Sequence, residues 1–335
     1  MKKSFLILLV LSLVLAACGG SAEEETVEET AVVEEAETLD SPATTVAETL
    51  DKITFGFIPS AEQADLQDNI KPLMKVLSDG LGIEVEGFVT SDFSGLLVAM
   101  GSGQADIGAF NTLGYVNALN VFPTRIEAIA KVVRYGSGSY HGNFWTTDAS
   151  VCDSPPVIGA FENIDGVPTL IKGSATAPPD VKALQVGWAF GDNGLEPEVR
   201  DGVTVSPGYA CEADLSVMIG NEVLFVEEGS TSGYLYPSLQ LKNLGIDYTS
   251  DITQVFAGSH DGVISGLYNG DAKFGVTYDD ARRTLRKTNP DVGEKVIAIG
   301  ITAEIPNDVV AVRSDLPEEI KGKIYQILSD YMATE

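Results

Sequence analysis

Three consecutive hydroxyl residues, Ser230, Thr231 and Ser232, lie between two glycines and closely follow an apolar run at 223–226. This order predicts a strand, a turn and the start of a helix. The first N–H groups of a helix have no intrahelical acceptor and lie at the positive end of its dipole, so hydroxyls there can complete a ring of donors around an oxyanion. One such Ser or Thr is usually only a cap. Three in succession favour a binding loop.

His260 is one of two histidines and stands at an apparent helix start, between Ser259 and Asp261. A lone histidine is often structural, but a ring here could donate an N–H to an anion, and the anion would favour its charged form. No close Cys/His spacing indicates a metal site. A nucleophile elbow needs Ser at its third position, where Thr231 stands. We therefore expect no catalytic residue, no metal and no cofactor.

Acidic side chains outnumber basic ones by 49 to 21. Eleven of the acids lie in 21–51 and two of the bases are Lys2 and Lys3, which leaves 38 acidic and 19 basic side chains elsewhere. Nucleic acid is not an expected partner, because no basic stripe is present to neutralise phosphates. An anion site in this chain should depend on neutral amides and hydroxyls rather than on arginine or lysine.

The N-terminus has the pattern of a secretory signal at 1–17, with two lysines before an apolar run that is too short to span a membrane. Leu15-Ala16-Ala17-Cys18 resembles the bacterial lipobox, which implies cleavage before Cys18 and lipidation of its thiol. An ordinary signal peptide with an incidental cysteine is the alternative. The acidic segment 18–51 has the composition of a disordered tether that holds a domain away from the bilayer.

Cys152 and Cys211 remain once Cys18 is assigned to lipid. In an oxidising compartment we expect them to form a disulfide, with two buried thiols as the alternative.

From Lys52 onwards, strand-like runs alternate with helix-like runs, which predicts an α/β fold with mainly parallel sheets flanked by helices. The segment 103–110 aligns without gaps with 270–277. Extending this alignment pairs Phe93 with His260 at helix starts, and Asn111 with Tyr278 after strand ends. Two similar halves would present such residues to a shared crevice.

Several further segments match one family in order: Ile53–Ile58 with Pro59, Lys71-Pro72-Leu73, Leu81-Gly82, Ala105-Asp106-Ile107-Gly108, Gly114-Tyr115-Val116, Gly229 to Pro237, His260-Asp261, 276–280, Ile305-Pro306 and Asp315-Leu316-Pro317. With these segments the chain resembles the substrate-binding proteins of phosphate, phosphite and phosphonate ABC transporters. The resemblance implies a two-lobed, type II periplasmic-binding-protein-like clamshell with the ligand cleft between the lobes. We expect lobe 1 at 52–133 plus 284–335 and lobe 2 at 134–283, with an insert at 137–220. The chain should cross between the lobes near Arg134 and again near 283–294.

The resemblance also implies a ligand site made of the hydroxyl triplet with Tyr115, His260 and Asp279. A carboxylate facing a phosphoryl group needs a shared proton or a ligand amine, so Asp279 could instead be a helix cap. Tyr278 adjoins it. Tyr115 could instead be a core aromatic residue on the helix after Asn111. The family often has Tyr where this chain has Phe93, and the lost hydroxyl could be replaced by Asn111, Thr112 or Ser60.

The function that follows is an extracytoplasmic, lipid-anchored monomer that captures phosphonate, phosphite or phosphate and delivers it to an ABC permease. A larger phosphorylated metabolite, such as a thiamine derivative, is an alternative ligand. A sensor domain is an alternative role, and a secreted hydrolase is not expected.

Overall fold

The computed structural model describes residues 50–61, 63–134, 137–172, 199–200 and 202–333. The signal sequence, Cys18 and nearly all of the acidic tether lie outside these residues. None of the helices within the described ranges is both long and apolar enough to cross a membrane.

The first sheet has the strand order β2-β1-β3-β17-β4. Strands β1, β2 and β3 are parallel, whereas β17 runs antiparallel between β3 and β4. The bounds are β1 Lys52–Phe57, β2 Glu84–Val89, β3 Ile107–Phe110, β4 Ile126–Lys131 and β17 Val309–Arg313. We call this sheet and its helices lobe 1.

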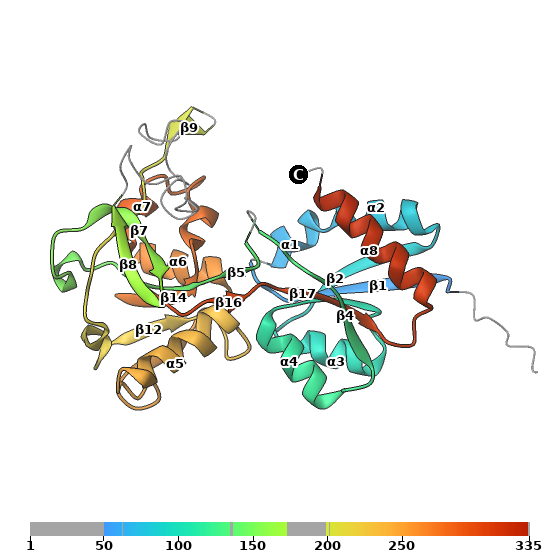
Figure 1. Cartoon of the computed structure of the whole chain (residues 1–335). Helices are drawn as coiled ribbons and strands as arrows, with labels where there is room; N and C mark the ends of the chain where they lie inside the picture. Colours follow the sequence, from blue (N-terminus) through green and yellow to red (C-terminus); the bar gives the residue numbers. More distant parts are fainter. Residues whose placement is uncertain (1–49, 62, 135–136, 173–198, 201, 334–335) are drawn as a thin grey trace, which may run out of the picture. The chain divides into compact units, whose positions relative to one another are not determined.

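Helices cover both faces of the first sheet, with α2 and α8 together on one face and α3 and α4 on the other (Figure 1). Leu77 of α2 and Ile324 of α8 are fully buried in the core beneath them. Helix α2 begins with Pro72 in its first turn and ends at Gly82, whose left-handed φ of 69° favours glycine. The bounds are α1 Gln63–Asn69, α2 Lys71–Leu81, α3 Gly95–Ser102, α4 Thr112–Val121 and α8 Glu318–Met332.

The second sheet has the order β13-β12-β14-β6-β15-β11-β7-β8, and we call it and its helices lobe 2. Both sheets are mixed, since antiparallel pairs accompany the parallel ones. The strands of the second sheet are β6 Gly142–Thr146, β7 Val157–Ile164, β8 Val167–Lys172, β11 Tyr209–Ala210, β12 Glu222–Phe225, β13 Thr253–Phe256, β14 Phe274–Tyr278 and β15 Ile297–Ile301. The short pair β9 Val199–Arg200 and β10 Val203–Thr204 is separate. The helices and turns are η1 Ala149–Val151, η2 Leu215–Met218, η3 Thr231–Leu235, α5 Tyr236–Asn243, α6 His260–Asn269, η4 Ala281–Thr284 and α7 Val292–Lys295.

The two lobes repeat one strand order. In each, the second strand, the first and the third lie side by side in parallel, as β2-β1-β3 and as β13-β12-β14, and an antiparallel strand follows. The helix before each third strand ends at a left-handed glycine, Gly103 with φ 77° or Gly270 with φ 86°. The gapless alignment of 103–110 with 270–277 therefore matches equivalent positions.

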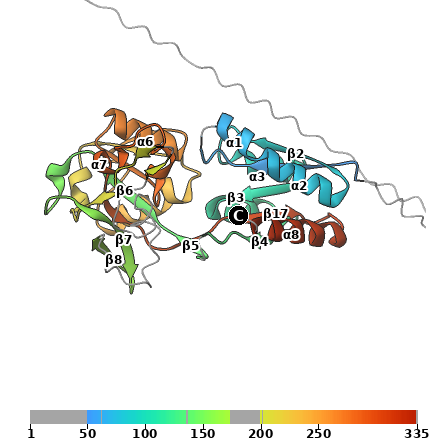
Figure 2. The same cartoon turned by 90° about the horizontal axis from the view of Figure 1, so that it is seen from above.

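Two chain segments connect the lobes and pair with each other as β5 (Ser139–Tyr140) and β16 (Ile305–Pro306). The first crossing lies near Arg134, whereas the second lies after β15 and not at 283–294, and Figure 2 shows these connecting segments between the lobes. Strand β15 pairs with β6 and β11, so residues up to Ile301 belong to lobe 2 and the expected boundary at 284 is wrong. Uniformly apolar residues at 297–301 do not reveal which sheet a strand joins.

The expected insert at 137–220 is also too long. It includes β6, a central strand whose residues are all buried, with Trp145 fully enclosed. The strands that lobe 2 has in addition to the five-strand order of lobe 1 are β11, β7 and β8, which lie together at one edge of the second sheet. Cys152 and Cys211 form the expected disulfide, with Cα atoms 5.6 Å apart.

Candidate functional site

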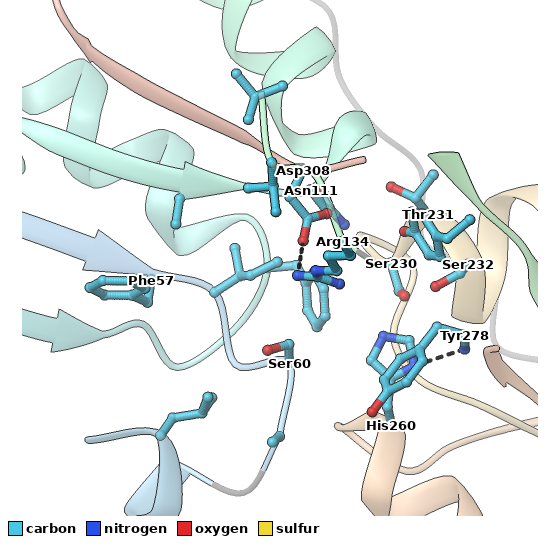
Figure 3. A pocket seen from close by; sticks show the side chains of 18 residues that line it. Phe57, Ser60, Asn111, Arg134, Ser230, Thr231, Ser232, His260, Tyr278 and Asp308 are labelled. Carbon is cyan, nitrogen blue, oxygen red and sulfur yellow. Dashed lines mark hydrogen bonds and ion pairs between the residues drawn. The ribbon is translucent and has the colours of Figure 1, made fainter. Parts of the chain in front are cut away.

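A cavity of about 360 Å³ is lined by both lobes and by the connecting segments (Figure 3). Eight of the eleven residues that the sequence proposed as ligand contacts line it, and each of them lies just after a strand or near the start of a helix. They are Ser60, Phe93, Asn111, Ser230, Thr231, Ser232, His260 and Tyr278.

The hydroxyl triplet stands at the start of η3, a π-helical turn, and its three side chains are almost completely buried. Gly229 precedes it because a Cβ there would lie 2.5 Å from the Cβ of Phe93. The Ser230 hydroxyl accepts the N–H of Gly233 at 3.1 Å and is the helix cap. The Thr231 hydroxyl accepts the N–H of Leu113 from lobe 1 at 3.0 Å. Within the triplet, Ser230 therefore caps the helix and Thr231 forms a hydrogen bond between the lobes.

The backbone of η3 provides the donors that remain. The first N–H groups of a helix lack intrahelical acceptors, and those of Thr231 and Ser232 bond to no other part of the described chain. The Ser232 hydroxyl shares a hydrogen bond with Tyr140, whose pKa is raised chiefly by burial. Two N–H groups and one hydroxyl are thus grouped at one wall of the cavity.

His260 begins α6 and is 5 % exposed. Its Nδ1 accepts the N–H of Tyr278 at 3.4 Å, and the two rings meet edge to face at 4.7 Å. Burial lowers the pKa of His260 to about 3, and the charge of Arg134 adds to this effect. The ring is therefore neutral near pH 7 in this structure and carries its proton on Nε2, as a hydrogen-bond donor rather than a cation.

The opposite wall, from lobe 1, is mostly apolar. Phe93 is buried there, and its N–H donates to the Glu227 carboxylate of lobe 2 at 3.1 Å. Asn111 caps α4 and donates from Nδ2 to the carbonyl of Gly229 at 2.8 Å. Further apolar residues on this side and along the connecting segments are Phe57, Ile58, Ala61, Leu66, Ala109, Val132 and Val309.

Three of the expected contacts lie outside the cavity lining. One of them is Thr112, whose hydroxyl donates to the carbonyl of Pro306 at 2.5 Å.

The other two are Tyr115 and Asp279. The Tyr115 hydroxyl accepts the N–H of Ala128 at 3.0 Å, and its ring packs near Phe110 in the core of lobe 1. Asp279 is buried and accepts Asn143 Nδ2 at 3.3 Å. Both side chains are held by structural partners, so the geometry does not support the predicted ligand contacts.

Three polar lining residues were missed by the sequence reasoning: Arg134, Tyr140 and Asp308. They lie on the segments between the lobes, where no motif marks them. Arg134 Nη2 donates to Asp308 Oδ2 at 2.7 Å. Burial raises the pKa of Asp308, and Arg134 opposes that effect. An arginine therefore lines the cavity, which the sequence reasoning did not predict. The predicted crossing near Arg134 was the one signal that could have revealed it.

The described residues contain no group of three or more His, Cys, Asp and Glu side chains suited to a metal. The cavity instead joins a donor wall from lobe 2, an apolar wall from lobe 1 and one ion pair. This arrangement suits a small anion with an apolar substituent.

Comparison with known proteins agrees with this geometry. The family model described as "ABC transporter, phosphonate, periplasmic substrate-binding protein" matches residues 55–335. The phosphate-import protein PhnD of Mycolicibacterium smegmatis is 25 % identical over 263 residues, which span 76 % of this chain and 63 % of that protein. The phosphonates-binding periplasmic protein of Escherichia coli is 22 % identical, over 89 % of this chain and 71 % of that protein.

A solved structure of PhnD1 from Prochlorococcus marinus in complex with methylphosphonate has a TM-score of 0.58, at 17 % identity and with 83 % of each chain covered. This likeness shows the fold, a periplasmic-binding-protein type of α/β architecture. The chain spans less than two thirds of the mycobacterial relative. Because the family model covers most of the sequence, the chain belongs to the family of periplasmic substrate-binding proteins of phosphonate ABC transporters.

Proposed function

We propose that this protein captures a phosphorus oxyanion in the cavity and delivers it to an ABC permease. The observation that carries the proposal is the donor wall: the N–H groups of Thr231 and Ser232, the Ser232 hydroxyl and the neutral His260 ring face one cavity. Donors aimed at an anion in a desolvated site form charge-assisted hydrogen bonds, which are stronger than neutral ones. A helix start adds its positive dipole end.

The substituent on phosphorus would face the apolar wall of lobe 1. Phe93 contributes an apolar ring where a tyrosine would offer a hydroxyl, so the site suits a ligand with one fewer hydrogen-bonding oxygen than phosphate. An alkylphosphonate or phosphite has this property. A cavity of about 360 Å³ also lies within the usual range of small-molecule sites, which supports a larger phosphorylated metabolite as the second candidate.

The setting of the protein is part of the same proposal. Lipidation at Cys18 would attach it to the outer face of the membrane, and the acidic segment to residue 51 would keep the binding lobes clear of the bilayer. There it would act as a monomer, without catalysis.

A melting-temperature screen with phosphate, phosphite, methylphosphonate, aminoethylphosphonate and sulfate tests this function. A ligand at 100 times its dissociation constant should add about 2.7 kcal/mol to the free energy of unfolding. We expect the largest shift with methylphosphonate or phosphite and none with sulfate. No shift with any phosphorus compound would contradict the proposal.

A further inference from the structure

The Arg134–Asp308 pair places charge in a cavity that is otherwise neutral. Both side chains line the cavity, and each stands on a different segment that connects the lobes. The Arg134 side chain is 52 % exposed and that of Asp308 is 22 % exposed. Neither was expected from any motif, and the donor wall of lobe 2 does not include them.

Arg134 has hydrogen-bonding capacity to spare. A guanidinium has five N–H donors, and within the described residues the Arg134 side chain bonds only to Asp308, through Nη2. Figure 3 shows the guanidinium within the cavity, with Asp308 on one side and the Ser230 region of the donor wall on the other. Burial lowers the pKa of His260 and raises that of Tyr278, and the Arg134 charge adds to the first effect and opposes the second.

Asp308 is suited to hold this side chain in place. Its backbone is fixed, because its carbonyl accepts the N–H of Val132 at 2.9 Å. The neighbouring Asn307 donates to the carbonyls of Val132 and Ser137 on the other connecting segment. The carboxylate is thus anchored beside Arg134, and a charged pair with fixed geometry loses less entropy when a ligand binds.

We propose that Arg134 is a second anion contact, opposite the donor wall, and that Asp308 positions it. The pair makes the site prefer a doubly charged phosphorus headgroup over a singly charged one of the same shape. This inference rests on the proposed function and names the charge state of its ligand. A neutral donor wall bonds to either anion through its oxygens, whereas a guanidinium that lies nearer to the ligand than its carboxylate partner distinguishes the two anions by charge.

Methylphosphonate and methanesulfonate provide the test, because they are close in shape but differ in charge. Above neutral pH the phosphonate is largely a dianion, and the sulfonate is a monoanion. Titration calorimetry gives the ratio of the two affinities for the wild type, Arg134→Gln and Arg134→Lys. We expect Arg134→Gln to reduce the preference for methylphosphonate by about tenfold or more, and Arg134→Lys to retain most of it. Arg125→Gln, an exposed arginine outside the cavity, should leave the ratio unchanged.

Asp308→Asn tests the positioning role, since it keeps the shape but releases the guanidinium. The ratio should fall towards that of Arg134→Gln, and a rise would contradict the assignment of Asp308. An unchanged ratio in Arg134→Gln, with tight methylphosphonate binding in both proteins, would overturn the inference and leave the proposed function intact. Failure of the wild type to bind methylphosphonate would contradict this inference, and failure to bind any phosphorus oxyanion would contradict the proposed function as well.

Discussion

The two lobes share a strand order but offer different chemistry to the cavity. The loop after β1 presents Ile58, whereas the chain after β12 presents Ser232 and its neighbours. At equivalent helix starts, lobe 1 has Phe93 and lobe 2 has His260. The shared topology therefore brings equivalent positions of the two lobes to one cavity, and the side chains at these positions differ in chemistry. In the proposed function, lobe 2 would donate hydrogen bonds to the headgroup and lobe 1 would enclose the substituent.

Replacing donor residues of lobe 2 with apolar ones, as in lobe 1, should have the largest effect on methylphosphonate affinity. The double variant Ser232→Ala with His260→Phe removes a hydroxyl and a ring N–H from the donor wall. Hydrogen bonds to charged groups contribute about 1.5–3 kcal/mol each, so methylphosphonate affinity should fall more than about 100-fold. Calorimetric titration measures the loss.

Ser238→Ala is the matched control, because Ser238 is buried in α5, its hydroxyl has no hydrogen-bond partner among the described residues, and it does not line the cavity. It should leave the affinity unchanged. A loss below tenfold in the double variant would mean that lobe 2 is not the donor wall.

Removing the disulfide of lobe 2 should affect stability and leave binding unchanged. Cys152 and Cys211 are 59 residues apart and lie away from the cavity. Replacing both with serine should lower the free energy of unfolding by about 2–4 kcal/mol, because the bridge restricts the unfolded chain. Denaturant titration checks this value. A matching loss of methylphosphonate affinity would show that the far edge of lobe 2 is coupled to the cavity.

His260 should make the stability of the protein depend on pH in a way that Phe93 does not. Its pKa is about 3 in the folded protein, below the ordinary value of 6.5, so between these values the unfolded chain binds the extra proton. The free energy of unfolding should therefore be highest above about pH 6.5 and fall by up to about 2 kcal/mol by about pH 5. Denaturation of the wild type and His260→Asn across this range measures the slope. The same slope in both proteins would contradict a buried, neutral His260.

Adding a donor to lobe 1 should have the smallest effect. Phe93→Tyr introduces a hydroxyl on the apolar wall, which can bond to a fourth oxygen. The affinity for phosphate relative to methylphosphonate should rise about tenfold, the effect of roughly 1.4 kcal/mol. Phe88→Tyr, on a ring that does not line the cavity, is the control. If phosphate does not gain in Phe93→Tyr, the substituent does not face this wall.

The fold was largely predictable from the sequence. The gapless alignment of 103–110 with 270–277 indicates two similar α/β units, and the Ser-Thr-Ser sequence at 230–232 marks the start of η3. The second crossing was not predictable. Residues 297–301 are apolar throughout, and such a strand is equally compatible with either sheet. Pairing with β6 decides between them, and this pairing depends on contacts distant in sequence.

The site was predictable where a helix start carries the residue and unpredictable elsewhere. Ser230 and His260 follow strand ends or helix caps that can be read locally. Tyr115 lies on α4, but its hydroxyl accepts the N–H of Ala128 on β4, and helix periodicity alone does not determine which way the ring points. Arg134 and Asp308 meet only because two segments 174 residues apart lie side by side.

A crystal structure of the protein with methylphosphonate tests the central claim most directly. We predict that its phosphonate oxygens lie within hydrogen-bond distance of the N–H groups of Thr231 and Ser232 and of His260 Nε2, and that the methyl group contacts Phe93. A phosphonate bound outside this cavity, or held with its oxygens against the ring of Phe93, would contradict the division of work between the lobes.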